Sequence, residues 1–173
     1  MPRLQAKANP RRSPEEKLAL AKLRTLPADE QRRALIAFSL RGRPYLREGK
    51  GVIYLNSSTS LDHPKRTIWK VGETRDLVRR QEEYRRCDRS HPHTWFFAFH
   101  VQRRLLAERI VQLSFLSKSN GGKRVYFRRR CSCGHRHREY VWFPTPKSLS
   151  DIVTIIFDSL ALIGETQISV EVL

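Results

Sequence analysis

The sequence is poor in cysteine and has no long hydrophobic run. Only 3 of its 173 residues are cysteines, an odd and small number that argues against a disulfide framework. No apolar run is long enough to span a bilayer, and the basic N-terminus lacks the apolar segment of a secretory signal. We therefore expect an intracellular protein with no membrane partner, located in the nucleus if the organism is eukaryotic.

Acidic residues are also scarce relative to basic ones. The chain has 34 Lys plus Arg against 17 Asp plus Glu, a formal net charge of +17. Such an excess repels itself unless a polyanion binds, and nucleic acid is the usual polyanion. The arginines concentrate at 75–89 and 123–138, a pattern that favours a binding surface over a merely solvated one. We expect nucleic acid as the partner, DNA in preference to RNA.

Two basic segments carry the residues expected to contact this nucleic acid. Arginine forks suit phosphate oxygens, so backbone contacts should dominate, and such binding weakens as salt rises. The expected contact residues are Lys70, Arg75, Arg79, Arg85, Arg86, Arg128, Arg129 and Arg130.

The order of the apolar segments predicts an α+β fold. Apolar runs at 52–55 and 67–71 flank a polar segment, a pattern typical of a β-hairpin with a long loop, and Gly72 should end the second strand. A helix should follow, because Leu77 and Tyr84 lie seven residues apart and share one helix face. Further strands are expected at 94–101, 125–127, 140–143 and 168–172, and helices at 102–116 and 150–163. This order predicts a small mixed or antiparallel sheet flanked by helices.

The chain should divide into four segments. Residues 1–12 are expected to form a basic disordered arm. A helical hairpin is expected over 13–44, because Ser13 to Glu16 have the pattern of a capping box and two leucine-rich stretches follow. Residues 45–146 should form the nucleic-acid-binding domain, with a C-terminal helix and strand at 147–173 packed on it.

Four residues could carry phosphodiester chemistry: Tyr54, Arg80, Tyr84 and Glu108. A carboxylate can hold a hard divalent cation such as Mg²⁺ or Mn²⁺. An arginine can neutralise the phosphate in its pentavalent state, and a tyrosine near the metal can position or deprotonate the attacking water. Their ordinary interpretation is structural, because arginine and glutamate are common on solvated helix faces and strand tyrosines are often half-buried.

A second cluster, Cys131-x-Cys133-x-His135-x-His137, has the residue types of a zinc site. Thiolates and imidazoles at alternate positions project from one side of an extended chain, so two or three can converge on one ion. Structural zinc prefers four such ligands. Candidates for the remaining ligand are Cys87, His91, His93 and His100. Two free cysteines in a basic loop are the alternative.

The order and spacing around residues 51–84 resemble the GIY-YIG nuclease superfamily. Its signature is a strand ending in tyrosine, a hairpin, a second strand ending in glycine, and a helix with an arginine eight residues later. Tyr54 stands at the end of the first tripeptide and Gly72 at the end of the second, where Lys70 occupies the place of the second tyrosine. Arg80 follows Gly72 by eight residues, and Tyr84 lies four further on.

The Trp-Lys-Val-Gly form is most similar to a phage-type DNA-binding branch and its fungal relatives named for meiotically upregulated genes. The resemblance covers Gly51 to Phe143 and implies a GIY-YIG-like fold. It implies a DNA-binding protein and a metal-dependent endonuclease. In that activity Tyr54 would help to activate water, Arg80 would contact the scissile phosphate, Tyr84 would assist and Glu108 would hold Mg²⁺ or Mn²⁺.

The same branch carries a Cys-x-Cys-Gly sequence with a following histidine and an upstream cysteine. This implies that Cys87, Cys131, Cys133 and His137 hold a structural Zn²⁺, separate from the metal at Glu108. An alternative of a different class is a zinc-stapled basic module that binds nucleic acid or an acidic protein and performs no chemistry.

Overall fold

An antiparallel sheet of six strands is the centre of the computed structural model, which describes residues 49–60, 63–86, 93–125 and 139–173. Its strand order is β4-β5-β2-β1-β3-β6. The strands are β1 (Gly51–Ser60), β2 (His63–Thr74), β3 (His93–Val101), β4 (Lys123–Val125), β5 (Tyr140–Trp142) and β6 (Ser169–Val172). The helices of the described ranges are α3 (Leu77–Arg86), α4 (Arg104–Phe115) and α5 (Leu149–Leu162). The predicted α+β class is confirmed.

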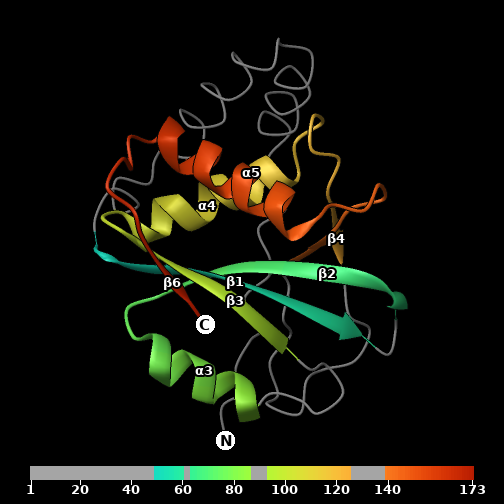
Figure 1. The fold of residues 1–173 in the computed structure, drawn as a ribbon, viewed down its shortest axis with the longest axis horizontal. Coiled ribbons are helices and arrows are strands. Elements are labelled where there is room, and N and C mark those ends of the chain that lie inside the picture. The colour runs from blue at the N-terminus through green and yellow to red at the C-terminus, as the bar shows by residue number, and fades with distance from the viewer. Residues whose placement is uncertain (1–48, 61–62, 87–92, 126–138) are drawn as a thin grey trace, which may run out of the picture.

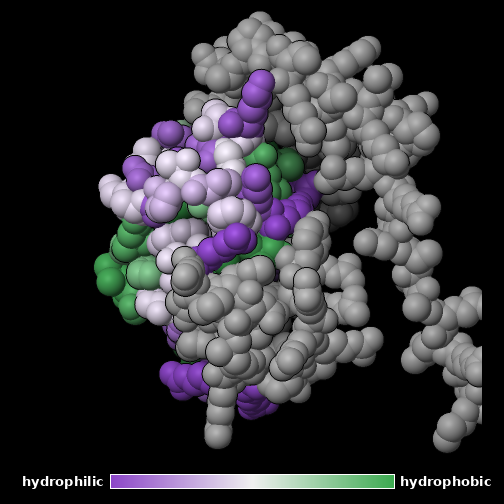
Figure 2. All heavy atoms as spheres, turned by 90° about the vertical axis from the view of Figure 1, so that its right-hand side faces the viewer, coloured by the Kyte–Doolittle hydropathy of each residue, from purple (hydrophilic) through white to green (hydrophobic). Residues whose placement is uncertain are grey.

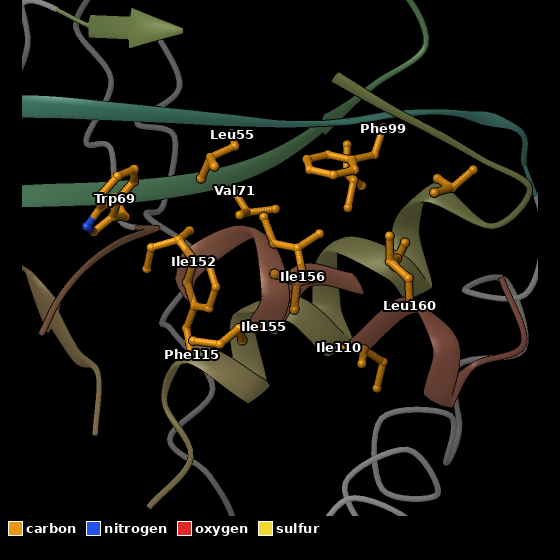
Figure 3. Close-up of a cluster of buried hydrophobic side chains, with 14 of the residues drawn as sticks. Leu55, Trp69, Val71, Phe99, Ile110, Phe115, Ile152, Ile155, Ile156 and Leu160 are labelled. Carbon is orange, nitrogen blue, oxygen red and sulfur yellow. The ribbon is translucent and has the colours of Figure 1, made fainter. Parts of the chain in front are cut away.

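Helices cover both faces of the sheet (Figure 1). The α4 and α5 helices lie on one face and α3 lies on the other. Because successive strand residues point to opposite faces, Ile53 and Leu55 belong to the α4–α5 face, whereas Tyr54 and Asn56 belong to the α3 face. The main core lies on the α4–α5 side (Figure 3), where residues of the sheet meet residues of the two helices: Leu55, Trp69, Val71, Phe99, Ile110, Phe115, Ile152, Ile155, Ile156 and Leu160.

The β1–β2 hairpin is longer than predicted. Its register runs from Val52↔Thr74 to Thr59↔Thr67, so much of the polar segment expected as a loop is strand. Serine and threonine are compatible with an antiparallel ladder, because the backbone supplies its hydrogen bonds. Gly72 does not end β2 but lies within it, opposite Tyr54.

A bulge in β3 changes which side chains face α3. Leu55 pairs with Phe97, whereas the next residue, Asn56, pairs with Trp95. The extra residue, Phe96, reverses the side-chain alternation beyond it. Phe96 and Phe97 therefore both pack against the main core, and Trp95 turns toward Tyr54 on the α3 face.

The α5 helix begins earlier than predicted. Ser148, rather than Ser150, is its N-cap and forms a capping box with Asp151. The Asp151 amide donates to Ser148 Oγ (3.1 Å) and the Ser148 amide donates to Asp151 Oδ2 (2.8 Å). Only Ser148 has a carboxylate three residues later, which explains the shift. Gly164, with φ of 73°, follows the end of the helix.

The chain after α5 is attached to the start of α4 by Glu165. This buried carboxylate accepts hydrogen bonds from the backbone amides of Gln102 (3.0 Å) and Arg103 (3.1 Å). It also pairs with Arg103 Nε at 3.2 Å. A carboxylate is favourable here because the N-terminus of a helix carries partial positive charge.

None of the helices in the described part of the chain is long and apolar enough to cross a membrane. The arm predicted at 1–12 and the helical hairpin predicted at 13–44 lie outside the described residues.

Candidate active site

The candidate site begins at Tyr54, which lies in the middle of β1 and is fully buried. Gly72 is its partner on β2. A Cβ atom placed on Gly72 would overlap the Tyr54 hydroxyl and ring. The phenol therefore lies across β2 in space that only a glycine leaves free.

A turn after β2 sets the position of Arg80. Asp76 Oδ1 accepts a hydrogen bond from the Arg79 amide (2.9 Å), which caps the start of α3. Thr74 Oγ1 in turn accepts from the Asp76 amide (3.1 Å). One turn into the helix, Arg80 Nε donates to the Tyr54 hydroxyl at 3.1 Å. The spacing of eight residues from Gly72 thus brings the guanidinium onto the phenol.

Tyr84 completes a cluster with Tyr54 and Arg80. It follows Arg80 by about one helical turn, so both side chains point toward the sheet. Its hydroxyl lies 3.3 Å from that of Tyr54, and the two rings meet edge to face with centroids 6.1 Å apart. Trp95 packs against both rings, at 4.8 Å from Tyr54 and 5.3 Å from Tyr84. We call Tyr54, Arg80, Tyr84 and Trp95 the tyrosine cluster.

The cluster differs in exposure from one member to another. Tyr54 is 0% and Tyr84 5% exposed, whereas the side chain of Arg80 is 33% exposed. Arg80 also pairs through Nη1 with Glu83 at 2.7 Å. A phosphate arriving from solvent would therefore meet Arg80 before it met either tyrosine.

Burial raises the pKa of the Tyr54 hydroxyl above its ordinary value, and the neighbouring Tyr84 raises it further. Lys70 and Arg80 oppose this shift through their positive charge. Tyr54 is consequently a neutral phenol at physiological pH. It can accept from Arg80 and still donate its own proton to a second oxygen.

Glu108 reaches the same region from α4. Arg104 Nε donates to Glu73 Oε2 (2.6 Å), and Gln112 Nε2 donates to the Val71 carbonyl (3.4 Å). Glu108 lies four residues from each of these helix residues, so it shares their face. Glu108 therefore faces the segment of β2 from Val71 to Glu73.

The charges that act on Glu108 include those of Lys70 and of Arg80 in the tyrosine cluster. Burial, followed by the carboxylates of Glu139 and Glu73, raises the pKa of its carboxyl to about 7. The charges of Lys70 and Arg80 oppose that rise. Within the described part of the chain, no hydrogen bond or ion pair engages this carboxylate.

Lys70 does not lie where a nucleic-acid contact was expected. It is 2% exposed, so its ammonium group is inside the fold rather than on the surface. Its Nζ pairs with Glu139 at 2.9 Å and lies over the rings of Tyr84 (5.6 Å) and Tyr140 (5.2 Å). The residue in the place of the second signature tyrosine therefore points into the tyrosine cluster.

The basic residues around α3 are exposed, as contacts to a phosphate backbone require. Figure 2 shows hydrophilic side chains at the end of the molecule where α3 lies in Figure 1. The exposed arginines are Arg75, Arg79, Arg85 and Arg86. Arg128, Arg129 and Arg130 lie outside the described residues.

The predicted zinc ligands Cys87, Cys131, Cys133 and His137 also lie outside the described residues. Two other candidates can be placed. His93 Nε2 lies 3.3 Å from the Tyr140 hydroxyl, and His100 is half-exposed, 3.7 Å from Glu171. Across 49–60, 63–86, 93–125 and 139–173, no three His, Cys, Asp or Glu side chains are grouped to hold a metal.

Several residues of the site were not predicted. Asn56 follows Tyr54 by two residues, so the strand period could have placed it on the same face. Trp95 could not be found this way, because its orientation depends on the bulge at Phe96. Glu139 is close to Lys70 only through the pairing of β5 with β2.

No protein-family model matches this chain, and neither the curated proteins nor the solved structures contain a match to it.

Proposed function

We propose that this chain is a DNA-binding protein with a GIY-YIG-type domain and that it cleaves phosphodiester bonds in a metal-dependent reaction. The observation that carries the proposal is the contact between Arg80 Nε and the Tyr54 hydroxyl. These residues are 26 apart in sequence, and the resemblance assigns both to one reaction. Glu108 lies on the side of α4 that faces β2, and it adds the carboxylate that such a reaction needs.

Arg80 is the residue that binds the scissile phosphate. Its guanidinium is charged at any physiological pH and one third exposed. A fork of N–H donors matches two phosphate oxygens. The charge that grows on these oxygens when water attacks phosphorus is stabilised most by a donor already in place.

The two tyrosines act on the attacking water. The Tyr54 hydroxyl accepts from Arg80 and contacts the Tyr84 hydroxyl, which leaves one hydrogen-bonding position, its proton or a lone pair, to hold the water next to the phosphate. Tyr84 keeps Tyr54 in this orientation through the 3.3 Å contact between the hydroxyls. The water oxygen bonds to phosphorus, the bond to the leaving oxygen breaks, and one proton passes from the water to the leaving group or solvent.

Glu108 fits a divalent metal ligand. Its carboxylate has no partner among the described residues, and nearby acidic residues raise its pKa, so a cation at this position would relieve their repulsion. Mg²⁺ is commonly held by one or two carboxylates together with water and substrate phosphate. When bound, such an ion supplies Lewis-acid stabilisation of the phosphate oxygens.

A plasmid-nicking assay with Mg²⁺ or Mn²⁺ tests this function. Glu108→Gln should lower the rate by about 100-fold, since it removes a metal ligand but keeps the shape of the side chain. The matched control is Glu82→Gln, which changes the same charge at an exposed position of α3. Equal nicking by the wild type and the Glu108 variant would exclude Glu108 as a metal ligand of the reaction, and no nicking by the wild type would exclude the nuclease.

The second candidate function is a zinc-stapled basic module that binds without chemistry. The complete burial of Tyr54 favours it, because a buried hydroxyl is remote from solvent. In that case all variants bind duplex DNA or an acidic protein in a salt-dependent way, and none cleaves. Metal analysis should then find about one equivalent of zinc per chain, lost on replacing Cys133 by serine.

A further inference from the structure

Lys70 is a buried cation whose position is hard to explain by stability. Its side chain is 2% exposed, while that of its partner Glu139 is 43% exposed. A carboxylate in contact with water compensates poorly for moving an ammonium group out of water. Replacing such a pair by a well-packed apolar residue is often neutral or stabilising.

A second costly polar group faces Lys70 across the hairpin. Asn56 pairs with Lys70 in the β1–β2 register and is 0% exposed. Neither its Oδ1 nor its Nδ2 has a hydrogen-bond partner among the residues that the structure describes. Buried amides are nearly always satisfied in folded proteins. Two such residues side by side, on the Tyr54 face, are typical of a site kept for function rather than for stability.

Lys70 is linked to the reacting residues through Tyr84. Its ammonium lies 5.6 Å from the centre of the Tyr84 ring, within the range of a cation–π interaction. The Tyr84 hydroxyl contacts Tyr54, and Tyr54 contacts Arg80. The other charged and titratable groups around Lys70 are Glu139, Tyr140, Glu108 and Arg80.

We propose that Lys70 is a positioning residue for the phosphodiester reaction. Its ammonium orients the ring of Tyr84, and through it the Tyr54 hydroxyl, and adds a second fixed positive charge behind Arg80. The inference rests on the proposed nuclease function. It accounts for a buried cation beside the tyrosine cluster.

The variant Lys70→Met tests this role, because methionine has a similar length, no charge and a flexible shape that fills the same space. We expect kcat for nicking to fall about 100-fold, the loss that a small misplacement of reacting groups can produce. KM for DNA should change by less than about threefold, because Lys70 is buried and does not touch the nucleic acid. The melting temperature should stay the same or rise.

Lys123→Met is the matched control. Lys123 is exposed on β4 and also lies over an aromatic ring, 5.9 Å from the centre of Trp142. Trp142 is not a member of the tyrosine cluster. The replacement of Lys123 should leave kcat within about twofold, since it removes the same kind of cation–π contact without a reacting neighbour.

Two other results would contradict the role of Lys70 as a positioning residue. A Lys70→Met protein with wild-type kcat, or one whose activity loss simply follows a lowered melting temperature, would make Lys70 a structural residue. In both cases Glu108→Gln would still lower the rate of cleavage by about 100-fold, so the nuclease proposal would stand. If the wild type does not nick DNA with Mg²⁺ or Mn²⁺, the nuclease proposal fails and the role of Lys70 fails with it.

Discussion

Tyr54 and Gly72 face each other across β1 and β2, and the Tyr54 phenol lies where a side chain at position 72 would be. The tyrosine of one strand therefore requires the glycine of the next.

Gly72→Ala should destabilise the fold by about 1–3 kcal/mol, because the added methyl overlaps the phenol in a packed region. The free energy of unfolding, measured by urea denaturation, checks this. The same substitution in a Tyr54→Leu background should have a smaller effect, since leucine leaves the space beside position 72 free. An equal effect in the two backgrounds would show that the overlap is not the cause.

Glu165→Ala should destabilise the protein by about 2–3 kcal/mol, because a buried carboxylate with charge-assisted hydrogen bonds is lost. Its amide partners at Gln102 and Arg103 would be left without an acceptor. Glu171→Ala is the control, an exposed glutamate in a loose pair with His100, and should change stability by less than about 0.5 kcal/mol. Similar losses of stability in both variants would show that the hydrogen bonds of Glu165 to the start of α4 do not stabilise the fold.

Glu108→Gln should stabilise the protein at high pH and not at low pH. The pKa of this carboxyl is raised from 4.5 to about 7 in the folded state. The folded state then binds more protons than the unfolded state between these values, so wild-type stability falls as pH rises from about 4.5 to about 7. Above that range the ionised, buried carboxylate carries its full penalty.

The gain from Glu108→Gln should therefore be larger at pH 8.5 than at pH 5 by about 2 kcal/mol. Urea denaturation of both proteins at the two pH values measures it. A gain that does not depend on pH would mean that the pKa of Glu108 is not raised, which would contradict the burial of its carboxyl and its proximity to Glu139 and Glu73.

Glu83→Gln should tighten DNA binding. Glu83 pairs with Arg80 (2.7 Å) and with Arg79 (3.1 Å), so its carboxylate occupies donors that phosphate would use. Releasing them should raise affinity about tenfold, the value of one hydrogen bond to a charged group. Fluorescence anisotropy with a duplex oligonucleotide in EDTA measures binding without cleavage.

The neighbouring Glu82→Gln is the control for Glu83, because it removes the same charge from an exposed residue of α3. It should raise affinity only about twofold through the change in net charge. Identical effects of the two substitutions would show that the ion pairs of Glu83 do not restrain Arg79 and Arg80.

Much of the site followed from local spacing. Helix α3 could be predicted because its apolar positions repeat with the helical period, and Arg80 and Tyr84 lie one turn apart on it. The α5 cap shows the limit of such reasoning. Ser148 and Ser150 are both capping residues by type, and the choice depended on which one has a carboxylate three residues later.

The extent of the hairpin was predicted wrongly because hydrophobicity was the guide to strand length. The ladder from Asn56 to Thr59 is built of polar residues, and its backbone pairing is cooperative with the apolar part that precedes it. Sequence period alone cannot assign Phe96 and Trp95 to a face, since an irregular residue in β3 reverses the alternation.

By itself the sequence determined the α+β class, the order of its elements, and the spacing that brings Arg80 to Tyr54, because these depend on periodicity and on short-range turns. Tertiary structure alone decided that Lys70 is buried among aromatic rings and that Glu108 faces β2. Both outcomes depend on strand register and on which face of α4 packs against β2, contacts between segments whose pairing no local pattern encodes.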